Sequence, residues 1–153
     1  MCVIVDANFA AELFGGSGTE RAQPILRWVS DPKHDGCLVY GGQLAAELKR
    51  VASAVRFLNQ LNRAGRARFL PDRDVDPEER KVRELGLKSD DPHVLGLARA
   101  SGARTLCTED RALQRDFKNP ALITKPRGSI YSKPEHTRLL RHTTSCGRLK
   151  RRR

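Results

Sequence analysis

Four acidic residues, far apart in the sequence, stand at positions where a parallel α/β sheet would bring them together. Asp6 directly follows a short apolar run, and Asp110 closely follows another. Glu47 and Asp91 fall in the first turns of two expected helices. Because strand ends and the starts of crossover helices share one edge of a parallel sheet, the four carboxylates should meet there.

Carboxylates with no neighbouring cluster of His or Cys are the ligands that Mg²⁺ and Mn²⁺ prefer. Ions held in this way activate a water molecule for attack on a phosphodiester and stabilise the departing oxyanion. The sequence therefore predicts metal-assisted phosphodiester hydrolysis with one or two such ions. The expected metal ligands and catalytic residues are Asp6, Glu47, Asp91 and Asp110, with Asp6 at the centre.

Three of these acids also have a purely structural interpretation. Asp6, Asp91 and Asp110 can each cap a helix or lie in its first turn, where the helix dipole favours negative charge. Glu47 is different, because it falls within the apolar arc of an expected long helix whose buried stripe is Leu44, Leu48, Val51, Val55 and Leu58. A buried carboxylate without a basic neighbour needs a partner, and a bound cation would supply one.

The elements that would position these acids alternate between strand and helix. Short apolar runs predict five strands, at residues 2–5, 36–40, 67–70, 104–108 and 121–124. Helical patterns separate them, at residues 7–14, 19–30, 43–64, 80–85, 91–101 and 111–117, and the acidic, Pro-interrupted stretch 72–79 is expected to be a loop. Apolar runs without alternation suit strands that are covered on both faces. We therefore expect a three-layer α/β domain with a parallel sheet.

Four parts of the sequence together resemble the successive motifs of PIN-domain nucleases. They are Val3-Ile-Val-Asp-Ala-Asn8, the internal Glu47, Asp91-Pro-His-Val-Leu-Gly-Leu-Ala98, and Thr105-Leu-Cys-Thr-Glu-Asp110 with Leu113. The similarity spans residues 2–124 and is greatest to prokaryotic stand-alone PIN proteins, many of which are toxins of toxin–antitoxin pairs.

This resemblance implies a five-stranded parallel sheet of order 3-2-1-4-5, dependence on Mg²⁺ or Mn²⁺, and endonucleolytic cleavage of single-stranded RNA. It carries metal binding onto the four acids and accessory polar roles onto Asn8 and Thr108. Asp90 is a rival for the third acid, although the Asp-Pro-His-Val register favours Asp91. An antitoxin protein and a second copy of the chain are the expected protein partners.

Positive charge is concentrated towards the C-terminal end. The formal net charge is +11, and residues 125–153 contribute +9 of it. Such a block favours RNA through the release of counterions, with a solubilising tail as the alternative. We expect a nuclease domain over residues 1–132 and a basic extension over residues 133–153. Lys125 and Arg127, just beyond the last expected strand, would guide RNA towards the acids or serve as ordinary surface charge.

Location follows from what the sequence lacks. It shows neither a secretory leader nor the roughly 18 consecutive apolar residues of a membrane helix. Four cysteines without CxxC spacing argue against a zinc site. The apolar surroundings of Cys2, Cys37 and Cys107 favour reduced thiols, and hence the cytoplasm.

Two other functions compete with the nuclease. One is an inactive PIN-like module that holds RNA or an acidic partner through the basic extension, and the complete acid set argues against it. The other is a phospho-accepting signalling domain, suggested by Thr108 and Lys125 but excluded by the single acid after the first strand and by Pro71 after the third. His93, in the first turn of its expected helix, is interpreted as a solvent-facing or capping histidine rather than a phosphate contact.

Overall fold

The computed structural model describes residues 2–15, 19–31, 33 and 36–140. Within these residues the centre is a parallel sheet of five strands in the order β3-β2-β1-β4-β5. The strands are β1 (Cys2–Val5), β2 (Cys37–Gly41), β3 (Ala67–Leu70), β4 (Thr105–Cys107) and β5 (Ser129–Tyr131). The expected α/β class, parallel sheet and strand order are confirmed.

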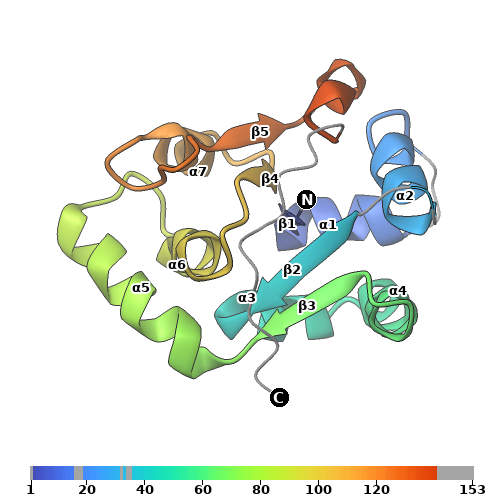
Figure 1. Cartoon of the computed structure of the whole chain (residues 1–153), viewed down its shortest axis with the longest axis horizontal. Helices are drawn as coiled ribbons and strands as arrows, with labels where there is room; N and C mark the ends of the chain where they lie inside the picture. Colours follow the sequence, from blue (N-terminus) through green and yellow to red (C-terminus); the bar gives the residue numbers. More distant parts are fainter. Residues whose placement is uncertain (1, 16–18, 32, 34–35, 141–153) are drawn as a thin grey trace.

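Helices cover both faces of this sheet (Figure 1). On one side lie α1 (Ala7–Phe14), α2 (Gln23–Ser30) and α4 (Ala52–Arg63), and on the other lie α5 (Asp72–Leu85), α6 (Pro92–Ser101) and α7 (Arg111–Lys118). α3 (Gly42–Lys49) follows β2 directly, and the 3₁₀ helix η1 (Pro134–Leu140) comes after β5. The chain therefore has the three layers that the sequence predicts.

β1 takes the central place because its side chains are apolar on both faces. All of its residues are buried, and Val3 lies opposite Leu38 of β2 and Thr105 of β4. Val5 lies opposite Cys107, so β1 and β4 end side by side. The polar residues that follow these two ends are thereby brought together.

The single long helix expected over residues 43–64 is wrong. α3 ends at Lys49, and α4 begins after Val51, whose extended backbone interrupts the helix. The two helices pack on different neighbours, since α3 contacts α6 whereas α4 contacts β3. A break between them lets each helix bury its own apolar residues, which a straight helix could not do.

The acidic stretch 72–79 is also not a loop but the first half of α5. Asp72 and Asp74 lie in the first turn, where the helix dipole favours acids. Val75 and Val82 are fully buried and fix the helix to the domain. Pro77 lies inside the helix without ending it, so reading proline as a breaker is the source of the error.

The fifth strand lies later in the chain than the sequence predicts. β5 is Ser129–Tyr131 and pairs with β4, whereas residues 121–124 form turns in which Leu122 and Ile123 are buried. Lys125 and Arg127 therefore precede β5 instead of following it. The prediction that they stand beyond the last strand, on the side of the acids, is wrong, because the start of a parallel strand lies at the opposite edge of the sheet.

The described part of the expected C-terminal extension packs on the domain. η1 contacts α2 and β5, and Leu140 is buried. The basic cluster at the end of the extension, and Cys146, lie outside the described residues. Cys37 and Cys107 are free thiols as expected, but Cys2 is disulfide-bonded, so the prediction of a reduced thiol is wrong there.

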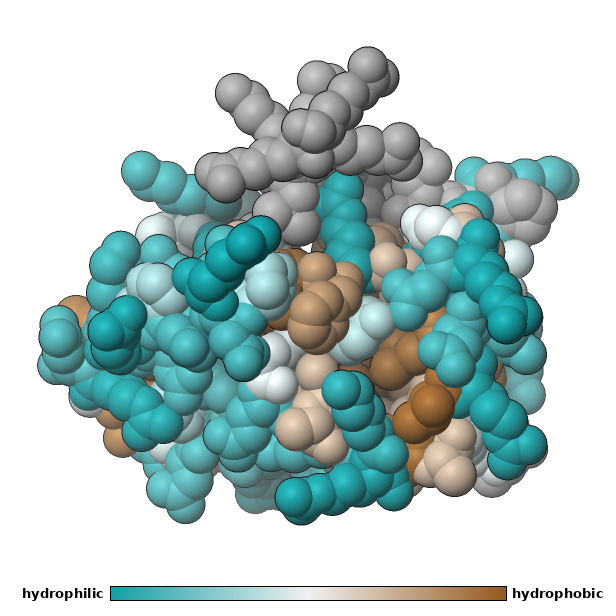
Figure 2. Space-filling view, turned by 90° about the horizontal axis from the view of Figure 1, so that it is seen from below, coloured by the Kyte–Doolittle hydropathy of each residue, from teal (hydrophilic) through white to brown (hydrophobic). Residues whose placement is uncertain are grey.

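Figure 2 shows one face, on which hydrophilic residues surround a smaller apolar area. Among the large hydrophobic side chains of the described residues, Phe69 and Leu85 are more than half exposed. No helix within the described ranges is long and apolar enough to cross a membrane.

Candidate active site

Asp6 is fixed where β1 ends. Its backbone N–H donates to the carbonyl of Cys107 in the neighbouring strand at 3.0 Å. Its side chain caps α1, with Oδ1 accepting from the N–H of Ala7 at 2.8 Å, and only 7% of the residue is exposed. The cap explains why a helix starts here, but it uses only part of the hydrogen-bonding capacity of the carboxylate.

Thr108 links Asp6 to the turn after β4. Its hydroxyl donates to Asp6 Oδ2 at 2.8 Å and accepts from the N–H of Asp110 at 3.2 Å, and the side chain is fully buried. Asp110 in turn caps α7, because its Oδ1 accepts from the N–H of Leu113 at 3.1 Å. The accessory polar position expected at Thr108 therefore contacts the first acid directly.

A tight turn sets the start of α3 and hence the position of Glu47. A side chain at Gly41 would place its Cβ 2.3 Å from the carbonyl oxygen of Leu70, so only glycine allows β2 and β3 to approach there. Gly42 has a φ of +55°, in the left-handed region that favours glycine. The chain turns at this pair from the end of β2 into α3, which carries Glu47 in its second turn.

Glu47 is partly buried, and its partner comes from another helix. The side chain is 28% exposed, and Oε1 accepts a hydrogen bond from Gln43 Nε2 at 3.2 Å. His93 Nε2 lies 3.5 Å from the same oxygen. The expectation that no basic group lies near Glu47 considered its own helix alone, and it misses this imidazole from α6.

His93 is neither solvent-facing nor a cap, so that interpretation is wrong. It is 2% exposed, because α6 is buried continuously from Pro92 to Ala98. Neither of its ring nitrogens has a hydrogen-bond partner among the described residues. The sequence signal that was available is the run of apolar and small residues after Pro92, which predicts a helix covered on every side.

Asp91, rather than Asp90, is the third acid of the site. Asp91 precedes α6 and is partly buried, and its side chain makes no capping hydrogen bond. Asp90 is exposed. The Asp-Pro-His-Val register therefore identifies the acid that faces the other carboxylates.

Electrostatic interactions link Asp91 with the other three acids, and we call the four together the acid cluster (Asp6, Glu47, Asp91 and Asp110). Burial raises the pKa of Asp91, and the charges of Asp6, Asp110 and Glu47 raise it further, whereas His93 lowers it. Burial likewise raises the pKa of Asp6; hydrogen bonds from Thr108 and Ala7 oppose this, and Glu47 adds to it. The sheet thus brings together acids from four separate segments.

In their present conformations, the side chains of the acid cluster do not form a complete metal-binding site. Among the described residues, no three His, Cys, Asp or Glu side chains are grouped closely enough to hold a metal ion. The donor set is nevertheless the kind that hard divalent cations take, namely carboxylate oxygens. Asp91 makes no capping bond and Glu47 is held by one amide, so both can turn without breaking the start of a helix.

The other predicted residues are all exposed. Asn8 is exposed in the first turn of α1. Lys125 and Arg127 are exposed before β5, and Arg127 Nε donates to the carbonyl of Lys118 at the end of α7 at 3.1 Å. This contact ties Arg127 to the far end of the helix that begins at the cluster.

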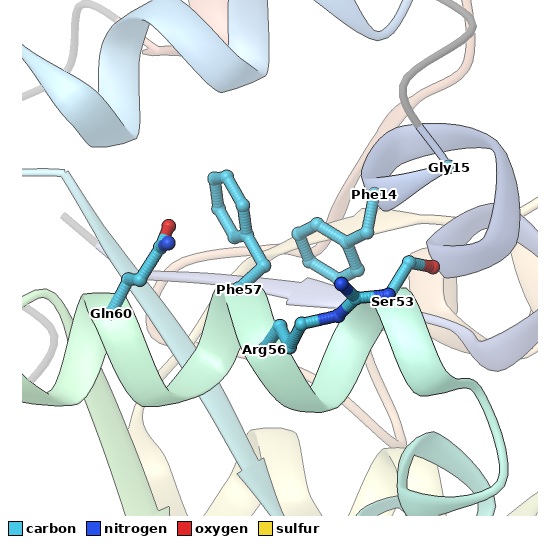
Figure 3. A pocket seen from close by; sticks show the side chains of 6 residues that line it. All are labelled: Phe14, Gly15, Ser53, Arg56, Phe57 and Gln60. Carbon is cyan, nitrogen blue, oxygen red and sulfur yellow. The ribbon is translucent and has the colours of Figure 1, made fainter.

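Two hollows lie outside the acid cluster. One, the α7 hollow, has a volume of about 250 Å³ and is lined by Arg111, Gln114, Arg115 and Lys118. The other, the α1–α4 hollow, has a volume of about 320 Å³ and is lined by Phe14, Gly15, Ser53, Arg56, Phe57 and Gln60 (Figure 3). The described lining of the α7 hollow comes from one face of a single helix, whereas α1 and α4 together line the other hollow.

Comparison with known proteins gives no relative: no family model, no curated protein and no solved structure matches the chain.

Proposed function

We propose that the chain is a metal-dependent endoribonuclease that hydrolyses phosphodiester bonds of single-stranded RNA. The observation that supports this most is the electrostatic coupling of Asp91 to three other carboxylates, each from a different segment. Four carboxylates that lie close together repel one another, and this repulsion favours the binding of a positively charged ligand. Divalent cations and their phosphate ligands meet that need.

Mg²⁺ or Mn²⁺ is the proposed cofactor. Asp6, Glu47, Asp91 and Asp110 would hold it, and when bound it would activate water and stabilise the departing oxyanion. The protein contributes orientation: Thr108 holds one oxygen of Asp6, and the N–H of Leu113 holds one oxygen of Asp110. Hydrogen bonds of this kind, made to carboxylates that would ligate a metal, hold the ligand oxygens in place before the metal binds.

RNA as the substrate, and the biological setting, depend on the sequence resemblance to PIN-domain nucleases. We extend the proposal on that basis to a prokaryotic toxin of a toxin–antitoxin pair, with an antitoxin protein and a second copy of the chain as partners. The net charge of +11 supports a polyanionic substrate.

A cleavage assay tests the proposal. The full chain is incubated with an end-labelled single-stranded RNA in Mn²⁺, in Mg²⁺ and in EDTA. We expect cutting with either ion, none in EDTA, and loss of cutting in Asp6→Asn and Asp91→Asn. Asp90→Asn is the matched control, since this exposed acid is the sequence neighbour of Asp91 and should keep full activity. Undiminished cutting in EDTA or by Asp6→Asn would refute the proposal.

One observation favours the alternative, an inactive PIN-like module that binds RNA or another partner. The carboxylates do not form a group of three that holds a metal as they lie in the described part of the chain. If RNA binds equally well with and without metal, and no divalent cation supports cleavage, the alternative holds.

A further inference from the structure

The α7 hollow gathers three positive charges on one face of a short helix. Arg111, Arg115 and Lys118 are spaced by four and three residues, so they project from the same side of α7. All three are exposed, and Gln114 completes the lining. None of the described residues that line the hollow is acidic.

These cations have no acidic partner among the described residues, although most neighbouring acids do have partners. The carboxylate of Asp116, on the same helix, is buried and accepts from the N–H groups of Lys88 and Ser89. Asp110 caps the helix, and Glu109 pairs with Arg21. Within the described part of the chain, therefore, no acidic side chain pairs with the cations of the hollow, and their exposed groups can take an anion from outside.

The hollow is also joined to the acid cluster through the chain. α7 begins directly after Asp110, and Lys118 is seven residues from Arg111, about 10 Å along a helix. Gln114 Nε2 donates to the carbonyl of Thr108 at 2.8 Å, and the hydroxyl of Thr108 holds Asp6. Arg127, bonded to the carbonyl of Lys118, adds a further cation at the far end.

We propose that the α7 hollow binds the phosphate backbone of single-stranded RNA, on nucleotides next to the one held at the acid cluster. This inference depends on the proposed ribonuclease function for the choice of RNA. Guanidinium groups bind phosphate oxygens in pairs, and a row of them follows a backbone without reading its bases. The chain has only eight aromatic residues, so contacts to the phosphates should contribute more to RNA binding than stacking on the bases.

The basic residues on α7 would also offset the repulsion between the acid cluster and the phosphates of a substrate. Carboxylates repel the phosphates of a substrate, so a substrate strand needs attractive contacts on either side of the site. The row on α7 provides them at the end of the helix that carries Asp110. Its contribution should appear in binding even when no metal is present.

The test measures binding of a fluorescein-labelled single-stranded RNA in EDTA at several salt concentrations. The triple variant Arg111→Gln, Arg115→Gln, Lys118→Gln is compared with a control that loses the same charge elsewhere, Arg63→Gln, Arg80→Gln, Lys33→Gln. Each phosphate contact contributes about 0.7 to the slope of log affinity against log salt for single strands. We expect the α7 triple to bind at least tenfold more weakly and to lose about 2 from this slope, while the control changes little.

Cleavage in Mn²⁺ separates this inference from the proposed function. The α7 triple should raise KM and leave kcat unchanged, because its residues hold flanking nucleotides and not the reacting bond. If wild-type protein cleaves RNA but the two triples bind alike, the α7 inference is overturned and the ribonuclease stands. If wild-type protein never cleaves but the α7 triple alone weakens binding, the inference holds and the ribonuclease fails.

Discussion

Glu109 and Asp110 are neighbours in the sequence, yet they belong to two different regions. In one region the acids pair with an arginine, and in the other they lie near further acids. Glu109 joins what we call the Arg21 cluster (Glu12, Arg21 and Glu109), in which the guanidinium of Arg21 pairs with both carboxylates. The same guanidinium lies over the ring of Phe9 at 4.9 Å. Asp110 instead belongs to the acid cluster, where the neighbouring groups are other acids and one histidine.

The pKa values follow this division. Hydrogen bonds from Arg21 lower the pKa of Glu12, as expected for an acid with a fixed cation beside it. Burial and the charges of neighbouring carboxylates raise the pKa of Asp91. Among the described residues, a guanidinium pairs with the acids of the Arg21 cluster, and no ion pair joins a guanidinium to the acid cluster. Under the proposed function, a divalent cation from solution would compensate the charge of the acid cluster.

Adding metal should produce the largest effect, because it supplies this compensating charge. In Mn²⁺ at one hundred times its Kd, the free energy of unfolding should rise by about 2.7 kcal/mol. For a chain of this size that corresponds to a Tm increase of roughly 5–10 °C. Thermal unfolding with and without Mn²⁺ measures it. Glu12→Gln should keep the increase and Asp6→Asn should lose it; an equal increase in both would show that the ion binds elsewhere.

The next largest effect should come from the hydroxyl that holds Asp6. Thr108→Val leaves Asp6 Oδ2 without its donor and the N–H of Asp110 without its acceptor, which should lower stability by about 1–3 kcal/mol. RNA cleavage should fall by roughly 10- to 100-fold, as for other groups that orient metal ligands.

Thr105→Val is the matched control for Thr108→Val. Thr105 is also a buried threonine, at the start of β4, whereas Thr108 follows the end of that strand. Substitution of Thr105 should leave cleavage unchanged. A similar loss of cleavage in both variants would mean that Thr108 acts only through the stability of β4.

The strand-end acids could be predicted from the sequence because they depend on local signals. Apolar runs at residues 2–5 and 104–108 identify two buried strands, and a carboxyl residue after each strand lies at the same edge of a parallel sheet. The strand order also followed, through the resemblance of the motifs. Neither inference needs to know how the helices pack.

His93 and β5 could not be predicted because they depend on packing between distant elements. α6 packs against α5, α3 and the sheet, so His93 is buried; the apolar run after Pro92 indicates a covered helix, but it does not show that His93 lies beside Glu47 of α3. The apolar residues Leu122 and Ile123 fill the core from turns, while the short strand that pairs with β4 begins with Ser129. A short buried apolar run in the sequence is therefore not always a strand of the sheet.

The smallest effects should appear in the pH dependence of stability without metal, where the two regions have opposite signs. The raised pKa of Asp91 means that the native state holds more protons than the unfolded state between the ordinary and the raised value, so stability falls as pH rises through that window. The lowered pKa of Glu12 has the reverse effect: its contribution is present above the ordinary carboxyl pKa and is lost as pH falls through the lowered value.

Urea unfolding in EDTA from pH 3 to pH 8 separates these contributions. At pH 7, Asp91→Asn should be more stable than the wild type, and Glu12→Gln less stable by about 0.5–1 kcal/mol; both differences should shrink at pH 3. Asp90→Asn should follow the wild-type curve, because Asp90 is exposed. If Asp91→Asn is instead destabilised at pH 7, Asp91 has a favourable partner, and the acid cluster is not the strained, cation-seeking site that distinguishes it from the Arg21 cluster.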